Sequence, residues 1–261
     1  MSFIFDTHAH YDDDMFDEDR EELLASLPSK GVCAVINCGT DETSSLKSLE
    51  YSKKYNFIWS AAGIHPHYAK DVSSGFIARF EKMLTDKKAV AIGEIGLDYH
   101  YDFSPKSAQI QVFENQLALA EKLSIPVIIH DREAHEDTLN ILKKYKVKGV
   151  VHCFSGSIEM ARELIKLGFY IGVGGAVTFK NAKKLPDVVS DIAIDSILLE
   201  TDCPYMTPVP FRGKRCDSSY INITAQKIAE LKNISVSTVF DTCIDNACKL
   251  FSIDKKELKL L

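Results

Sequence analysis

Eight short runs of apolar and β-branched residues recur along this chain, and a stretch with amphipathic helical periodicity follows each of them. This alternation is typical of βα units around a parallel sheet, because the crossover between two parallel strands needs a helix-length connection. The predicted strands are residues 3–8, 32–37, 57–62, 89–94, 126–130, 149–152, 169–172 and 197–200.

The clearest helical pattern covers residues 107–123, where Ile110, Phe113, Leu117 and Ala120 recur at three- and four-residue spacing on one face. The other predicted helices are residues 17–30, 44–54, 76–84, 135–145, 157–167, 181–189 and 220–232, with an extra C-terminal helix over 236–251. Eight βα units predict a (β/α)8 TIM barrel, which typically takes about 250 residues. We therefore expect residues 1–261 to form one barrel domain. An open doubly wound sheet is the alternative, but no glycine fingerprint follows the first strand.

Composition limits the classes of protein to consider. Hydrophobic residues make up 46% of the chain, enough for a large core, and the net charge of −6 argues against binding nucleic acid through the overall field. Any contact with nucleic acid must then be local. The seven cysteines include no CxxC pair, the N-terminus lacks a basic leader, and no apolar run approaches the roughly 18 residues of a membrane span. These features predict a reduced, cytoplasmic protein with no membrane contact; they leave the oligomeric state open, with a monomer as the simplest expectation.

Residues that can bind metal ions stand at the ends of the apolar runs. These residues are His8, His10, Glu94, His130, His152 and Asp202. In a barrel, the active-site side chains come from the carboxyl ends of several strands, so all six are expected to share one site.

His8 and His10 are two residues apart, so in an extended chain both imidazoles point the same way and can bind one ion. Glu94 differs because a carboxylate has two oxygens and can bridge two cations about 3.5–4 Å apart. Taken singly, each residue also fits a structural role: a polar strand end for the histidines, or a buried salt bridge for Glu94.

His130 and His152 would be ligands of a second ion, and Asp202 would be a further ligand of the first. Asp6 lies on the same face as the two N-terminal histidines, and we expect it to be an interior group that is not a ligand. Residues of the types that bind metal ions stand at five strand ends, which favours a two-metal hydrolytic site over coincidence.

Two further features suit a phosphate-bearing substrate. His65, in GIHPH after the third run, could donate a hydrogen bond to a phosphate or leaving group; a loop-stabilising histidine is an equal alternative. Arg212, Lys214 and Arg215 form a tight basic cluster after the eighth run. Such a cluster suits phosphate, although a solvated surface loop would have the same composition.

Nearly the whole chain resembles one known family. The matching segments are FDTHAH, GIHPH, AIGEIGLDYHYDFSPK, VIIHDREA, VVHCFSG, VTFKNAKKLP, LLETDCPYMTP and PFRGKR. They resemble the TatD-type deoxyribonucleases, which belong to the metal-dependent hydrolase superfamily with amidohydrolase-like barrels. The resemblance implies a cation-dependent nuclease, with 3′ to 5′ exonuclease activity in some members.

The resemblance also assigns residues. Its metal ligands correspond to His8, His10, Glu94, His130, His152 and Asp202, and its phosphate-contacting positions to His65, Arg132 and residues 212–215. The wider superfamily often bridges its metals with a carboxylated lysine on the fourth strand, whereas this chain has Glu94 there. The chain departs from the family pattern after RGKR, where it has Cys216, Asp217 and Ser218 in place of Asn-Glu-Pro.

These features predict a metal-dependent hydrolase that cleaves DNA phosphodiester bonds by attack of a metal-bound hydroxide. We expect a 3′–5′ exodeoxyribonuclease acting on single strands or free ends, with Asp202 as general base and with Glu94 and His65 as further catalytic residues. Two divalent ions are expected; imidazole-rich ligation favours zinc or manganese, whereas the family is usually described with magnesium. The alternatives are a hydrolase of the same fold that cleaves a small amide, lactone or aminoacyl ester, and a non-catalytic partner in a nuclease assembly.

Overall fold

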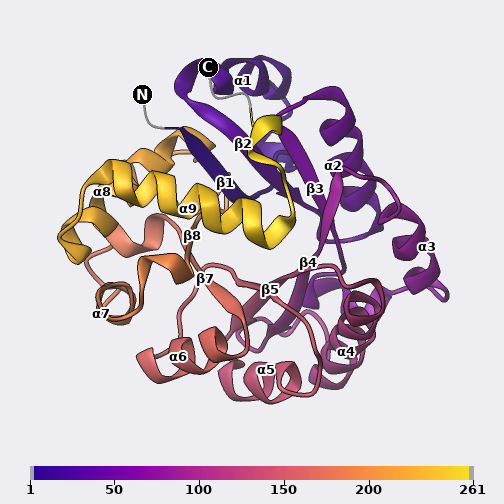
Figure 1. Ribbon diagram of the computed structural model, residues 1–261. Helices are drawn as coiled ribbons and strands as arrows, with labels where there is room; N and C mark the ends of the chain where they lie inside the picture. Colours follow the sequence, from indigo (N-terminus) through magenta and orange to yellow (C-terminus); the bar gives the residue numbers. More distant parts are fainter. Residues whose placement is uncertain (1–2, 259–261) are drawn as a thin grey trace.

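A computed structural model describes residues 3–258, and in them eight parallel strands form one sheet whose order follows the sequence. The strands are β1 (Ile4–Ala9), β2 (Val32–Cys38), β3 (Ile58–Ala62), β4 (Ala89–Asp98), β5 (Val127–Arg132), β6 (Gly149–Val151), β7 (Phe169–Val173) and β8 (Ile197–Leu199). Each strand pairs with the next one along the chain, and Figure 1 shows them around a common centre with the helices outside. The predicted (β/α)8 barrel is confirmed.

The barrel is closed by residues that follow the short strand β8. Ala9 and Cys203 form an isolated parallel bridge, and the His10 N–H donates to the Cys203 carbonyl at 2.8 Å. The Asp202 N–H donates to the His8 carbonyl at 3.0 Å. Closure therefore places the end of the first strand and the segment after the last strand side by side, and both carry predicted ligands.

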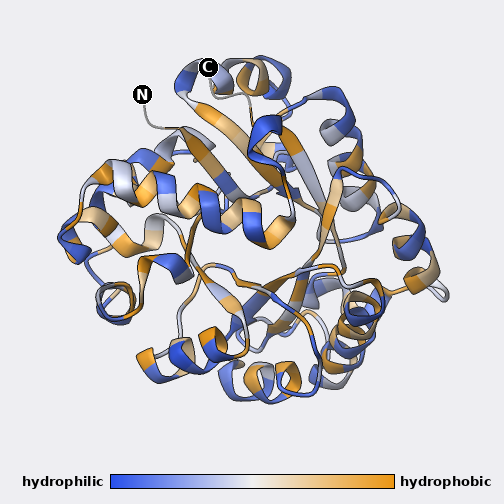
Figure 2. Ribbon diagram, in the orientation of Figure 1, coloured by the Kyte–Doolittle hydropathy of each residue, from blue (hydrophilic) through white to orange (hydrophobic). Residues whose placement is uncertain are grey.

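The helices that follow the strands cover the outside of the sheet. They are α1 (Arg20–Ser26), α2 (Glu42–Lys54), α3 (Phe76–Met83), α4 (Lys106–Leu123), α5 (His135–Leu142), α6 (Ile158–Lys166), α7 (Lys184–Asp191) and α8 (Ile221–Lys232). Their apolar and polar residues alternate along each helix, as the colours in Figure 2 show. In α4, Phe113, Leu117 and Ala120 are fully buried, as the predicted face requires. None of the helices between residues 3 and 258 has both the length and the apolar character needed to cross a membrane.

The predicted C-terminal helix is present as α9 (Val236–Phe251), which lies against β1 and β8 in Figure 1. Its Ile244 and Phe251 belong to the same buried cluster as Phe5 of β1 and Leu198 of β8. The Asn246 side chain donates to the Ile197 carbonyl at 2.9 Å. This helix therefore stabilises the part of the barrel where the first and last strands meet.

The predicted ends of β4, β5, β6 and β8, next to candidate ligands, were wrong, two because the strand is longer and two because it is shorter. β4 continues four residues beyond Glu94 to Asp98, because Ile95 and Leu97 extend the ladder with β5. β5 likewise continues past His130 to Arg132. Conversely, β6 and β8 end before residues 152 and 200. Residues 175–178 form a 3-10 turn, and α7 begins three residues later than predicted.

Candidate metal centre

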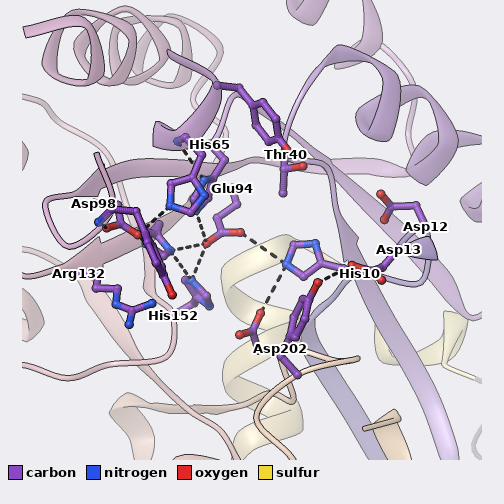
Figure 3. A pocket seen from close by; sticks show the side chains of 15 residues that line it. His10, Asp12, Asp13, Thr40, His65, Glu94, Asp98, Arg132, His152 and Asp202 are labelled. Atoms are coloured by element: carbon purple, nitrogen blue, oxygen red, sulfur yellow. Dashed lines mark hydrogen bonds and ion pairs between the residues drawn. The ribbon is translucent and has the colours of Figure 1, made fainter. Parts of the chain in front are cut away.

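A pocket of about 410 Å³ is lined by residues at the carboxyl ends of the strands, and Figure 3 looks into it. The predicted site residues among its lining are His10, His65, Glu94, His130, Arg132, His152 and Asp202. His8 lies beneath this surface with only 1% of its area exposed. The fold therefore brings the six predicted ligands together.

The carboxylate of Glu94 lies at the centre of this pocket, and its two oxygens face different histidines. Oε2 is 3.5 Å from Nε2 of both His8 and His10. Oε1 is 2.7 Å from Nδ1 of His130 and 2.6 Å from Nε2 of His152. The dashed lines in Figure 3 show Glu94 between these two sides. One carboxylate thus spans two imidazole clusters, which is the geometry that a bridging ligand needs.

Asp202 lies beside His8 and His10, the two histidines that face Oε2 of Glu94. Its Oδ1 atom is 3.7 Å from His8 Nε2 and 3.5 Å from His10 Nε2. The backbone of Asp202 has a φ of 61°, a left-handed conformation that aspartate adopts more readily than most residues. We call His8, His10 and Asp202 around Oε2 the first cluster, and His130 and His152 around Oε1 the second cluster.

The potential ligand atoms lie close enough to hold ions. Three overlapping groups have all their ligand atoms within 4.8 Å of one another: His8 with His10 and Glu94, His8 with His152 and Asp202, and His65 with Glu94 and His130. The His152 ring stacks on His8 with centroids 3.9 Å apart, so His152 adjoins both clusters. Nitrogen and carboxylate donors in this number suit a pair of divalent cations.

Hydrogen bonds set opposite tautomers in His10 and His65. Nδ1 of His10 lies 2.9 Å from the Cys38 carbonyl, which can only accept, so Nδ1 carries a hydrogen and Nε2 has a lone pair once the ring is neutral. In His65, Nδ1 accepts the backbone N–H of His67 at 3.2 Å, so Nε2 carries the hydrogen and faces Glu94 Oε1 at 3.6 Å. His10 is therefore arranged as a ligand, whereas His65 is arranged as a hydrogen-bond donor.

Charges inside the pocket shift the pKa values of these groups strongly. Although burial opposes the charged imidazole, Asp202 and Glu94 raise the pKa of His10 to about 10. The pKa of His130 rises to about 9 despite burial, because Asp98 and Glu94 stabilise its charged form. Burial and the neighbouring His152 lower the pKa of His8 to about 4. A cation at this centre must therefore compete with protons held by His10 and His130.

Asp98, at the end of β4, orients His130 by a hydrogen bond to Nε2, the ring nitrogen that does not face Glu94. Its Oδ2 atom is 3.1 Å from His130 Nε2 and 3.0 Å from His67 Nε2, and its Oδ1 atom accepts the Tyr101 N–H at 3.0 Å. Although burial opposes ionisation, these hydrogen bonds hold the pKa of Asp98 below its usual value. Asp98 was not predicted because the predicted strand ended at Glu94, although Ile95 and Leu97 continue the apolar pattern beyond it.

Asp6 is fully buried beneath the ligands and belongs to none of the three potential ligand groups. It accepts the Thr201 hydroxyl at 2.6 Å and the Ser218 hydroxyl at 2.7 Å. Ser218 also lies 2.7 Å from the Tyr11 hydroxyl. Part of the segment that departs from the family pattern therefore supports the interior near β1.

Comparisons with known proteins identify the family of this chain. A family model described as TatD related DNase matches residues 5–252. The chain belongs to this family. It is 44% identical to "Uncharacterized metal-dependent hydrolase YabD" of Bacillus subtilis, over 96% of this chain and all of that one. It is 32% identical to "3'-5' ssDNA/RNA exonuclease TatD" of Cronobacter sakazakii, over 95% of this chain and 97% of that one.

Among solved structures, the chain resembles that of YJJV, a TatD homologue from Escherichia coli K12. The TM-score is 0.90 and the identity 31%, covering 96% of this chain and 98% of that one. This chain is thus a metal-dependent hydrolase of the TatD family. Membership in an enzyme family contradicts the alternative of a non-catalytic partner.

The predicted phosphate-binding residues of this TatD-family chain lie in two places. Arg132 lines the metal pocket, with its guanidinium 4.7 Å from the centre of the Tyr101 ring. Arg212, Lys214 and Arg215 line a neighbouring hollow of about 260 Å³.

Arg215 differs from its neighbours because its guanidinium is already paired. Its nitrogens lie 2.5 and 2.7 Å from the carboxylate oxygens of Asp19, and it also donates to the Met15 carbonyl at 2.8 Å. The structure therefore does not bring Arg215 to the metal pocket, and gives it contacts that connect the loop before α1 with the loop after β8.

Besides Asp98, three polar residues in or beside this TatD-family site were not singled out from the sequence. Glu200 is buried, accepts the Cys153 N–H at 2.5 Å, and has its pKa raised to about 8 by burial. His67 and Tyr205 line the pocket. His67 could have been found, because it forms a second HxH pair with His65; Tyr205 gave no signal beyond being an aromatic residue in a loop.

Proposed function

We propose that this TatD-family chain binds two divalent cations and hydrolyses phosphodiester bonds at the 3′ end of single-stranded DNA. The observation that carries the proposal is the position of Glu94, whose oxygens face separate imidazole clusters. The relative from Cronobacter sakazakii, named as a 3′–5′ exonuclease for single-stranded DNA and RNA, supports the choice of substrate.

The first cluster and Glu94 Oε2 would hold one cation, and the second cluster and Glu94 Oε1 would hold the other. The donor set fits such ions, because His8, His10 and His152 are buried and the His10 ring is oriented by its hydrogen bond to the Cys38 carbonyl. Its high nitrogen content favours zinc or manganese over magnesium, which prefers oxygen ligands.

When bound, such cations lower the pKa of a coordinated water and offset charge on phosphoryl oxygens. Asp202 is better suited than Glu94 to accept and pass on a proton, because its side chain is 20% exposed and that of Glu94 only 4%. Although burial opposes ionisation, His10 and His152 hold the pKa of Asp202 below its usual value, so its carboxylate is ionised and has room to accept a proton.

Two other groups would contact the phosphate. The hydrogen on His65 Nε2 points into the centre and can be donated to a phosphoryl oxygen. Arg132 has its guanidinium at the pocket wall, where it can form two parallel hydrogen bonds to phosphate oxygens.

The test is to incubate the metal-loaded protein with 5′-labelled single-stranded DNA, duplex DNA, RNA and a panel of small esters, amides and lactones. We expect the single strand to shorten stepwise from its 3′ end, and expect a chelator or Glu94→Gln to abolish the reaction. Cleavage of a small ester or amide without cleavage of any oligonucleotide would contradict the proposal and favour the small-molecule alternative.

A further inference from the structure

The metal pocket and the basic hollow beside it share one residue, Tyr205. Tyr205 is 50% exposed, and because it lines both spaces it forms a wall between them. On the far side of this wall, the hollow is lined by Phe179, Arg212 and Lys214 among others. A polymer that leaves the metal pocket in this direction must pass the Tyr205 ring.

The Tyr205 ring is held in place at its outer end. Its hydroxyl donates to Asp13 Oδ2 at 2.7 Å, and Asp13 Oδ1 accepts the Met15 N–H at 2.8 Å. Because the ring is already fixed, it loses little conformational entropy when a flat group stacks on it.

Arg212 and Lys214 present free positive charge in the hollow. The Arg212 guanidinium lies 4.0 Å from the centre of the Phe179 ring, and the Lys214 ammonium lies 5.3 Å from that of Phe211. Within residues 3–258 neither cation forms an ion pair with a carboxylate, whereas Arg215 is paired with Asp19. These two cations are available to an anion.

We propose that this hollow is a second nucleotide subsite, in which an unpaired base stacks on Tyr205 and the adjoining phosphate binds Arg212 and Lys214. The inference rests on the proposed function and defines the substrate further. Because a base in a duplex is already stacked, only an unpaired strand of at least two nucleotides can fill both spaces. Stacking accepts every base, so the subsite selects for single strands and not for a sequence.

The experiment combines a variant with a modified substrate. Single-stranded hexanucleotides carry one abasic site at each position in turn, and kcat/KM for the first bond cleaved is measured with the metal-loaded protein. Loss of a base–aromatic stack corresponds to a roughly 5- to 150-fold loss. We expect that loss for one abasic position with the unmodified protein, and for Tyr205→Ala with the intact substrate.

The decisive result is the combination of the two changes. If the missing base is the one that stacks on Tyr205, its removal should not lower kcat/KM any further in Tyr205→Ala. Tyr205→Phe, which keeps the ring and removes only its hydroxyl, should retain most of the activity and the full abasic effect. Metal content should be unchanged in both variants, because Tyr205 supplies no atom to the three groups of potential ligands.

Two outcomes overturn the inference in distinguishable ways. Suppose that the unmodified protein cleaves oligonucleotides, but the abasic site lowers kcat/KM by the same factor in Tyr205→Ala as in the unmodified protein. The proposed function then stands and the stacking subsite is wrong. If the unmodified protein cleaves no oligonucleotide, the proposed function and the subsite are both wrong.

Discussion

Asp98 and His130 are joined by a hydrogen bond of 3.1 Å between Oδ2 and Nε2, which leaves the other ring nitrogen of His130 facing Glu94. A carboxylate behind a histidine ligand fixes its orientation and raises its basicity. We expect Asp98→Asn to weaken metal binding by about 10- to 100-fold. Isothermal titration with zinc or manganese measures this, and equal affinity in the two proteins would contradict the role. The amide oxygen can still accept the Tyr101 N–H, so the fold should be kept.

Glu94 and Asp202 are expected to differ in how many ions they hold. Glu94→Gln should lower occupancy at both sites because its oxygens face both clusters, whereas Asp202→Asn should lower occupancy only at the first. Elemental analysis after equilibrium dialysis gives the stoichiometry, and circular dichroism checks the fold. Equal metal content in Glu94→Gln and the unmodified protein would rule out the bridging role.

The basic hollow should control the salt dependence of DNA binding. Replacing Arg212 and Lys214 with Ala should weaken binding of a single-stranded oligonucleotide, and each lost phosphate contact should make the slope of log affinity against log salt shallower by about 0.7. Metal content should not change. Fluorescence anisotropy at several salt concentrations measures the slope, and an unaltered slope would show that these cations do not contact phosphate.

Arg215 provides the matched control for that experiment. Its pair with Asp19 is partly exposed, so Arg215→Ala should lower the free energy of unfolding by about 1 kcal/mol or less. The salt slope of DNA binding should change less than in the Arg212 and Lys214 variant. Urea denaturation and the same anisotropy titration separate these effects; a large change in slope would show that Arg215 leaves Asp19 to bind phosphate.

Metal binding should release protons. Carboxylates raise the pKa of His10 to about 10 and of His130 to about 9, so both imidazoles are protonated near pH 7 in the metal-free protein. Because only the neutral imidazole binds a cation, the apparent metal affinity should rise with pH and level off above about pH 10. Titrations in buffers of different ionisation enthalpy count the protons, with about two expected at pH 7. No proton release at pH 7 would contradict these shifts.

Much of the proposed metal centre could be predicted because its proposed ligands interrupt strong local patterns. His8, His130 and His152 each stand at or beside the end of an apolar run, and the barrel gathers such positions at one mouth. Predicting Glu94 needed only its residue type and approximate place, so the wrong strand end did no harm. The same wrong end hid Asp98, because apolar alternation alone does not say where a ladder stops.

The sequence by itself therefore determined the barrel and the residues proposed as ligands, since both follow from periodicity and residue type along the chain. Only the tertiary structure decided which groups face one another. Arg215 meets Asp19 across 196 positions of sequence, and Tyr205 stands between two hollows formed by distant loops. The direction of the hydrogen on His65 depends on the fold around residue 67. These properties depend on distances between atoms that no spacing along the chain specifies.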